Sequence, residues 1–260
     1  MVKRYGLLIE YDGADFYGWQ RQQEFRTVQG EIETALSRMA KEPIELHGSG
    51  RTDKGVHAGG QFAHFDWTVP IPAQDLTRAL NAKLPRDIVI LDAKEMPSDF
   101  HSRYDCKGKV YRYRFYTEKI PRARQSRYAL RVGWDLDQEK MARAAKSFIG
   151  TYDFKGFTSA RCDKEITVRS VYHASIHRNG NDWEFITAGS GYLYNMVRVM
   201  VGTLIDIGRG RLEEDVIQQI LETQDRTLGG KTVTPEGLSL EKVFYSAEER
   251  EAWTRSNSID

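Results

Sequence analysis

The pattern of apolar and polar positions in the first hundred residues predicts alternating strands and helices. Residues 5–11 and 61–69 are short runs rich in apolar and aromatic side chains, ended by aspartate, glycine or proline, which favours strands. Between positions 28 and 39, apolar residues recur every three or four places behind a candidate capping residue, Thr27. This spacing predicts an amphipathic helix that ends at about Ala40.

The next segments complete a recognisable order of elements. Residues 43–46 and 88–93 predict two more strands, and a helix is expected from Pro72 until Pro85 stops it. The resulting order, β-α-β-β-α-β, is the split pattern of ferredoxin-like domains. A glycine-rich segment then joins the two middle strands.

The second half of the chain repeats much of this order. A strand is expected at 109–116, a helix at 137–150, and two strands at 167–177 and 182–188, with a hairpin turn at Asn179-Gly180. Three further elements follow, namely a very apolar helix at 191–208, a helix at 213–221 and a strand at 238–245. We therefore expect an α+β chain of two similar halves, residues 1–104 and 105–260, whose antiparallel sheets join side by side.

The glycine-rich segment runs from His47 to Gln61 and holds five glycines between positions 48 and 60. Such density interrupts regular structure and lets backbone approach backbone or ligand closely. The same segment carries one carboxylate, Asp53, two cations, Arg51 and Lys54, and one imidazole, His57. Composition alone favours a solvated hairpin loop, but a charged cluster on a glycine loop is also where a scaffold carries chemistry.

Charge is unevenly distributed along a chain whose formal net charge is only +1. Between Arg103 and Arg131 stand ten lysines and arginines against two acidic residues, and five aromatic residues are threaded through the first part of this stretch. A basic segment interleaved with aromatics favours a polyanion bound against one face of the protein, although a solvated charged strand has the same composition.

The cysteines, the hydropathy and the first residues of the sequence restrict the expected location of the protein and its expected metal content. The two cysteines, Cys106 and Cys162, form no CxxC pair, so we expect free thiols in a reducing compartment, the cytoplasm, and no metal site. No apolar run approaches the roughly 18 residues of a membrane span. The start of the sequence leads directly into a strand, so no signal peptide is expected.

Several motifs together resemble the tRNA pseudouridine synthases of the TruA family. The stretch from Gly50 to Ala58, GRTDKGVHA, is similar to the signature loop of that family. Further similar motifs occur in the family's order over residues 5–245, namely YDG at 11–13, GWQRQ at 18–22, DFHSR at 99–103, KVYRY at 109–113, Phe154 with Phe157, and MVR at 196–198. The resemblance therefore covers nearly the whole chain. It implies the pseudouridine synthase fold, with two ferredoxin-like (RRM-like) halves.

The resemblance also implies a reaction, which is the isomerisation of uridine to pseudouridine at positions 38–40 of the tRNA anticodon stem-loop by a homodimer. That reaction breaks the N1–C1′ bond and joins the base again through C5, so it transfers no electrons and we expect no cofactor. Asp53 matches the catalytic aspartate of the family, and a carboxylate can attack the ribose or deprotonate it. Attack at C1′ and proton removal at C2′ both stay open.

Two other residues match the active site of the family. Arg198 matches an arginine that keeps the aspartate charged, and an arginine inside an apolar helix needs such a partner. Tyr111 matches the active-site tyrosine, which can stack on the uracil or relay its C5 proton. Leu193 is expected to line the pocket one helical turn and a residue from Arg198, and Phe157 and His57 are candidate neighbours of the site.

The remaining expected contacts are with RNA. A target base inside a stem-loop has to leave its stack, and Arg51 beside Asp53 is placed to enter the space that it vacates. Arg21, Lys54 and the basic stretch 103–131 are candidates for phosphate contacts.

Two rival functions use the same residues differently. A non-catalytic RNA-binding module with this fold would not require Asp53 or Arg198. A metal-dependent phosphodiesterase would use Asp53, His57 and His101, but one carboxylate is too few for a two-metal site.

Overall fold

The computed structural model describes residues 2–158 and 166–257, and the chain forms two compact units. The first unit consists of Met1–Lys107 and Ser239–Tyr245, and the second of Gly108–Leu238 and Ser246–Asp260. The halves predicted from the sequence meet at residues 104 and 105 instead. The main difference from these halves is that the strand near residue 240 belongs with the first unit.

The sheet of the first unit has the strand order β4-β1-β3, with β2 and β10 pairing along different parts of β3. Its elements are β1 (Lys3–Tyr11), α1 (Val28–Ala40), β2 (His47–Gly48), β3 (His57–Trp67), α2 (Ala73–Asn81), β4 (Ile88–Met96) and β10 (Leu238–Phe244). The neighbours β1, β3 and β4 are antiparallel, and this is the expected ferredoxin-like arrangement. The parallel pairing of Ser239 with His57 explains why the late strand joins the first unit.

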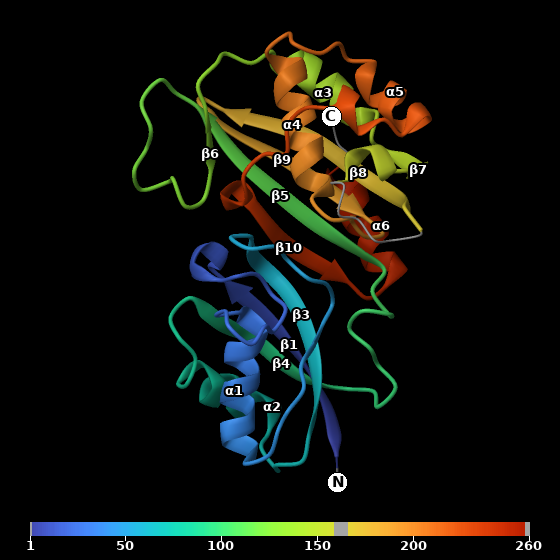
Figure 1. Cartoon of the computed structure of the whole chain (residues 1–260). Coiled ribbons are helices and arrows are strands. Elements are labelled where there is room, and N and C mark those ends of the chain that lie inside the picture. Colours follow the sequence, from blue (N-terminus) through green and yellow to red (C-terminus); the bar gives the residue numbers. More distant parts are fainter. Residues whose placement is uncertain (1, 159–165, 258–260) are drawn as a thin grey trace. The chain divides into compact units, whose positions relative to one another are not determined.

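Two helices cover this sheet. Thr27 caps α1, because its hydroxyl accepts a hydrogen bond from the Gly30 amide, as the sequence predicted. Val28, Ile32 and Leu36 of the apolar stripe of α1 are fully buried, and α2 lies beside α1 (Figure 1). The predicted strand at 43–46 is wrong, because only His47 and Gly48 pair with β3 in this region.

The second unit is built on the strand order β5-β9-β8-β7, with the short β6 pairing alongside β5. Its strands are β5 (Gly108–Thr117), β6 (Leu130–Val132), β7 (Gly150–Asp153), β8 (Val168–Asn179) and β9 (Asp182–Gly189). Its helices are α3 (Gln138–Lys146), α4 (Met196–Gly208), α5 (Val216–Thr223) and α6 (Ala247–Asn257). Helix α3 packs on both β8 and α4 (Figure 1).

In this unit the predicted helix cap at Asp137 and the predicted positive-φ glycine of the hairpin, Gly180, are both found. Asp137 caps α3 by accepting a hydrogen bond from the Lys140 amide, and Gly180 takes a positive φ of 61° in the hairpin turn. The alternating face of β5 is buried at Tyr113 and Phe115, as expected. Tyr116, expected on the polar face, is buried as well, because the Arg122 guanidinium lies 4.9 Å over its ring and the Arg122 amide donates to its hydroxyl.

Three features of the second unit differ from the prediction. Helix α4 begins at Met196 and not at Gly191, because Asn195 adopts the left-handed conformation with φ 60° just before it. The short strands β6 and β7 were not expected. The polar helix α6, which buries none of its residues, was not expected either.

No helix in the described part of the chain is long and apolar enough to span a membrane.

Candidate active site

Asp53 lies in a tight turn between β2 and β3 of the first unit. The Val56 amide donates a 3.1 Å hydrogen bond to the Asp53 carbonyl, and Gly55 between them has a φ of 79°. That left-handed conformation is inexpensive only for glycine. The side chain of Asp53 is half-buried, so the turn holds a carboxylate partly shielded from water.

The two ends of this loop are held together by a buried amide. Gln61 is fully buried, and its side chain accepts a 2.7 Å hydrogen bond from the Ser49 hydroxyl and donates a 2.9 Å bond to the Gly50 carbonyl. Next to it, the hydroxyls of Tyr11 and Thr52 lie 2.8 Å apart. Burial raises the pKa of Tyr11, so this hydroxyl stays neutral and serves as a structural hydrogen-bonding group.

A second segment, the loop after β1, is bonded to the turn on both sides of Asp53. The Trp19 amide donates to the Thr52 carbonyl at 3.1 Å, and the Gly55 amide donates to the Phe16 carbonyl at 3.3 Å. Between these contacts lies Gly18, where a Cβ atom would come within 2.7 Å of the Thr52 carbonyl oxygen. The position of the Asp53 backbone is therefore set mainly by backbone contacts, and the glycines make them sterically possible.

His57 contributes to this arrangement as a hydrogen-bond acceptor. Its Nδ1 accepts a 3.0 Å bond from the Gly13 amide and lies 3.1 Å from a carboxylate oxygen of Asp12. These contacts connect the start of β3 to the end of β1 and give His57 a structural role.

The cations expected to contact RNA surround the same turn. Arg51 and Lys54 are exposed, and the Lys54 ammonium lies 4.6 Å over the Tyr17 ring. Arg21 is also exposed, but its guanidinium already forms a 2.9 Å ion pair with the buried Glu33. Arg21 is therefore positioned by helix α1.

Tyr111 occupies the second unit, near the start of β5, and only 8% of it is exposed. Its ring meets that of Tyr192 edge to face, with centroids 5.1 Å apart. The Tyr192 hydroxyl lies 3.0 Å from that of Thr187 on β9, and burial raises the pKa of Tyr192. Tyr192 is thus a neutral contact that restrains the Tyr111 ring.

Arg198 is the third residue of α4, in the second unit, and the residues next to it, Val197 and Val199, are buried. Its Nε donates to the Val233 carbonyl and its Nη1 to the Asn195 side chain, both at 2.7 Å. The side chain is half-buried and not enclosed as the apolar helix suggested. Leu193 is buried but precedes the helix, so its expected helical spacing from Arg198 is wrong.

Phe157, considered as a neighbour of the site, is fully buried in the core of the second unit. Its ring meets those of Phe148 and Phe154 at centroid distances of 5.1 and 6.1 Å. This packing accounts for its position without a catalytic role.

Two residues that were not predicted to matter help to build these sites. Gln61 stood out in the sequence only as the end of the glycine stretch, and its burial comes from long-range packing. Asn195 holds Arg198 and also adopts φ 60°, a conformation that asparagine tolerates better than most residues. Asparagine is unfavourable inside a helix, so its presence within the predicted helix 191–208 was a signal that the helix begins after it.

His57 and His101, the histidines of the rival metal-dependent site, make separate contacts. His101 accepts hydrogen bonds from the Arg103 and Tyr104 amides and packs on His64, whereas His57 bonds to Gly13. Among residues 2–158 and 166–257, no three His, Cys, Asp or Glu side chains are grouped so that they could hold a metal ion.

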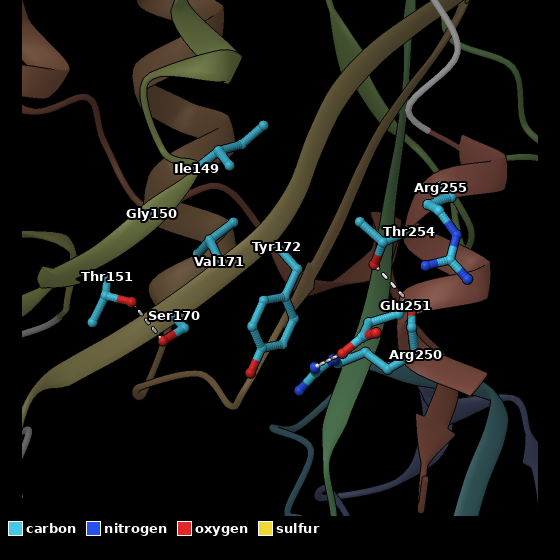
Figure 2. A pocket seen from close by; sticks show the side chains of 10 residues that line it. All are labelled: Ile149, Gly150, Thr151, Ser170, Val171, Tyr172, Arg250, Glu251, Thr254 and Arg255. Carbon is cyan, nitrogen blue, oxygen red and sulfur yellow. Dashed lines mark hydrogen bonds and ion pairs between the residues drawn. The ribbon is translucent and has the colours of Figure 1, made fainter. Parts of the chain in front are cut away.

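A cavity of about 460 Å³ lies elsewhere in the second unit, between β7, β8 and α6. Figure 2 shows Tyr172 and Arg250 facing one another there, with the guanidinium 4.6 Å over the ring. Tyr111, Leu193 and Arg198 do not line this cavity. We therefore assign no catalytic role to it.

Comparisons with known proteins agree with the sequence motifs. The family model described as tRNA pseudouridine synthase matches residues 7–105 and 144–246. The chain is 44% identical over 239 residues to tRNA pseudouridine synthase A of Acetivibrio thermocellus, which covers 92% of this chain and 98% of that protein. The enzymes of the same name from Exiguobacterium sp. and Caldicellulosiruptor bescii are 43% and 44% identical over 244 and 239 residues, covering 94% and 92% of this chain and 98% of each of them. The chain belongs to the tRNA pseudouridine synthase family.

Proposed function

We propose that this protein isomerises uridine to pseudouridine in the anticodon stem-loop of tRNA, at positions 38–40, with Asp53 as the catalytic residue. The observation that carries the proposal is the carboxylate of Asp53, half-buried on a turn whose backbone is bonded on both sides to a second loop. Membership of the family supports the reaction, and the motif resemblance supports the residue and the tRNA positions.

The reaction needs little from the protein beyond one reactive group and a closed pocket. The N1–C1′ bond breaks, the detached uracil turns, and a C5–C1′ bond forms, while C5 loses a proton and N1 gains one. Reactant and product are isomers, so the balance needs no oxidant or co-reactant. Asp53 acts either by adding to C1′ as the base leaves or by taking the C2′ proton, and both routes require it to be ionised.

Burial of a carboxylate disfavours its charged form, so a cation beside it would favour catalysis. We assign this role to Arg198, on the basis of the motif that contains it. Two guanidinium bonds, to the Val233 carbonyl and the Asn195 side chain, would hold the group in a defined orientation. Tyr111, restrained by Tyr192, is the proposed partner of the uracil, by stacking or by relaying its C5 proton.

Arg51 is exposed on the same turn as Asp53, which supports its proposed entry into the base stack. We further propose that the active enzyme is a cytoplasmic homodimer. The homodimer derives from the family resemblance, and the cytoplasmic location from the two cysteines expected to be free thiols. Sedimentation of the purified protein would check the oligomeric state.

The decisive experiment compares Asp53→Asn with a matched change on the same unit, Asp75→Asn, whose side chain is exposed on α2. We expect Asp53→Asn to lower turnover at least about a thousandfold, with tRNA affinity within a few-fold of wild type. Asp75→Asn should retain both. Pseudouridine formation and tRNA binding are measured on the same preparations.

Each rival predicts a different result. If Asp53→Asn kept more than about a thousandth of wild-type turnover, Asp53 would not be the catalytic residue. If wild type bound tRNA but formed no pseudouridine, the non-catalytic module would be favoured. Strand breaks that disappear with EDTA would favour the phosphodiesterase.

A further inference from the structure

An exposed aromatic pair stands next to the turn that carries Asp53. Tyr17 and Phe25, from the loop after β1, stack with ring centroids 4.0 Å apart and an interplanar angle of 12°. Tyr17 is 39% exposed and Phe25 is 45% exposed. Phe25 is the one apolar residue in an exposed run from Arg21 to Arg26, so its position is not explained by a core that it would fill.

This pair is connected to the catalytic turn through its side chains and its backbone. The Lys54 ammonium, one residue after Asp53, lies 4.6 Å over the Tyr17 ring. The Tyr17 amide donates to the Arg26 carbonyl at 2.9 Å, which closes the loop that carries both rings. The Phe16 carbonyl and the Trp19 amide, on either side of Tyr17-Gly18, bond to Gly55 and Thr52. The rings are therefore held at a defined position relative to Asp53.

The two rings differ in what remains available to a ligand. Tyr17 already contacts both an aromatic ring and a cation. Phe25 contacts Tyr17 on one face, so its exposed area belongs to its other face and its edges. An exposed aromatic face in a defined position is the usual platform for an unpaired base, because every base can stack on it.

We propose that Phe25 is a stacking site for one unpaired base of the RNA substrate, next to the base that reacts. The inference rests on the proposed function, since it takes RNA as the ligand and Asp53 as the reacting group. The ammonium of Lys54 next to this pair favours a polyanion such as a nucleic acid as the ligand. Stacking also requires no particular base, which suits an enzyme that serves several neighbouring positions.

The first test measures binding of an anticodon stem-loop RNA in an Asp53→Asn background, where turnover does not interfere. Phe25→Ala should weaken binding about 5- to 100-fold, the usual effect of losing one base–aromatic contact. Phe25→Tyr should stay within about threefold, and Phe25→Leu should lose most of the affinity although it remains apolar. Leu91→Ala is the matched control, because Leu91 is 44% exposed on β4 of the same unit.

Salt dependence distinguishes stacking from phosphate binding. Phe25→Ala should lower the affinity equally at all salt concentrations, because stacking releases no counterions. Lys54→Ala should instead make the slope of log K against log salt shallower by about one. A changed slope for Phe25→Ala would overturn the assignment of Phe25 to a base.

The second test identifies the base through a double-mutant cycle. Abasic nucleotides are placed one at a time in the loop of the RNA, and each RNA is measured with Phe25 and with Phe25→Ala. At one position, removal of the base should weaken binding to the Phe25 protein but have little further effect on Phe25→Ala. Additive effects at every position would overturn the proposal.

Two further results would assign Phe25 a different role and overturn the proposal. If Phe25→Ala bound RNA as Leu91→Ala does but changed the oligomeric state, the ring would contact a second copy of the chain. If only the melting temperature fell, and equally for Phe25→Tyr, the pair would serve to stabilise the loop. Failure of the proposed function would appear separately, as turnover by Asp53→Asn with the binding results unchanged.

Discussion

The turn that carries Asp53 and the segment that carries Arg198 are held in opposite ways. Around Asp53, backbone amides and carbonyls of two loops bond to one another, and Gly18 makes their approach possible. Arg198 sits on a regular helix, and its own side chain reaches a backbone carbonyl and an asparagine. The comparison shows two ways to position a charged group. Backbone hydrogen bonds position the Asp53 carboxylate, whereas hydrogen bonds of the guanidinium itself position the charge of Arg198.

The largest expected effects, on stability and on turnover, come from replacing one closely packed glycine in each unit. A Cβ at Gly13 would lie 1.9 Å from the Val56 carbonyl oxygen, and a Cβ at Gly202 would lie 1.8 Å from the Lys231 carbonyl oxygen. We expect Gly202→Ala to lower the free energy of unfolding by about 3 kcal/mol or more, because a helix in a packed core has little room to move. Gly13→Ala should cost less stability but most of the turnover, because the loop shifts and moves Asp53.

Denaturant unfolding and turnover of both variants measure this difference. Gly180→Ala is the control, since its φ is 61° but nothing lies within 4 Å of the added atom, so it should cost only about 1 kcal/mol. Equal losses of stability in Gly13→Ala and Gly202→Ala would contradict the contrast between a movable loop and a fixed helix.

The first unit is expected to lose stability in mild acid. Burial, with His47, His101 and Arg4 nearby and Asp66 opposing them, lowers the pKa of His64 from 6.5 to about 4. The folded state therefore disfavours the protonated ring, so the unfolded chain binds more protons below pH 6.5. The contribution of His64 to the free energy of unfolding is fully present above pH 6.5. It is lost as the pH decreases towards 4, by up to about 3 kcal/mol.

Unfolding free energies at pH 7, 5 and 4 for wild type and His64→Gln test this expectation. The substitution should remove most of the difference between these pH values, whatever it does to stability at pH 7. In the second unit, burial also lowers the pKa of His173, so His173→Gln is the matched comparison. An unchanged pH dependence in His64→Gln would mean that other groups cause the acid sensitivity.

Arg198 should affect both stability and the ionisation of Asp53. Arg198→Ala removes charge-assisted bonds to Val233 and Asn195 and should cost about 2 kcal/mol of stability, together with turnover. Arg198→Lys should recover part of each and raise the pKa of Asp53, moving the acidic limb of the pH–rate profile upward by about a unit. The profile is measured at saturating tRNA. An unmoved limb, with the loss only in affinity, would assign Arg198 to RNA binding.

The smallest expected effect is a difference in the salt dependence of tRNA binding between two arginines of the basic stretch 103–131. Binding of tRNA should depend on salt with a slope of log K against log salt steeper than about −2. Arg124 is exposed and forms no ion pair within the described residues, so Arg124→Ala should make the slope shallower by about one. Arg114 already pairs with Glu184 at 3.1 Å, so Arg114→Ala should change the slope less. Equal changes would mean that this ion pair opens when RNA binds.

Several elements were predictable because their signals are local. The hydroxyl of Thr27 and the carboxylate of Asp137 each cap a helix that begins at the next residue. The hairpin turns at Gly180-Asn181, one residue later than predicted, with the positive φ at Gly180 that glycine allows. The strands around them follow from periodicity. Asp53 could be selected because its loop combines glycines with a motif that resembles a known family, and not because composition requires it.

Other features were decided by contacts with residues outside the predicted element. Residues 43–46 look like a strand, but the edge of β3 is divided between β2 and β10, and β10 lies almost two hundred residues later. Tyr116 alternates like a surface residue and is nevertheless covered by Arg122.

The amino-acid sequence by itself determined the family, the order of the main elements and the residues that can perform the chemistry, because these depend on residue type and on nearest neighbours along the chain. Only the tertiary structure decided that Gln61 closes the Asp53 loop, that Arg198 is held by Val233, and that Phe25 stacks on Tyr17 beside Lys54. Each of these contacts joins residues at least eight positions apart in the chain, and their free energies exist only once folding has brought those residues together.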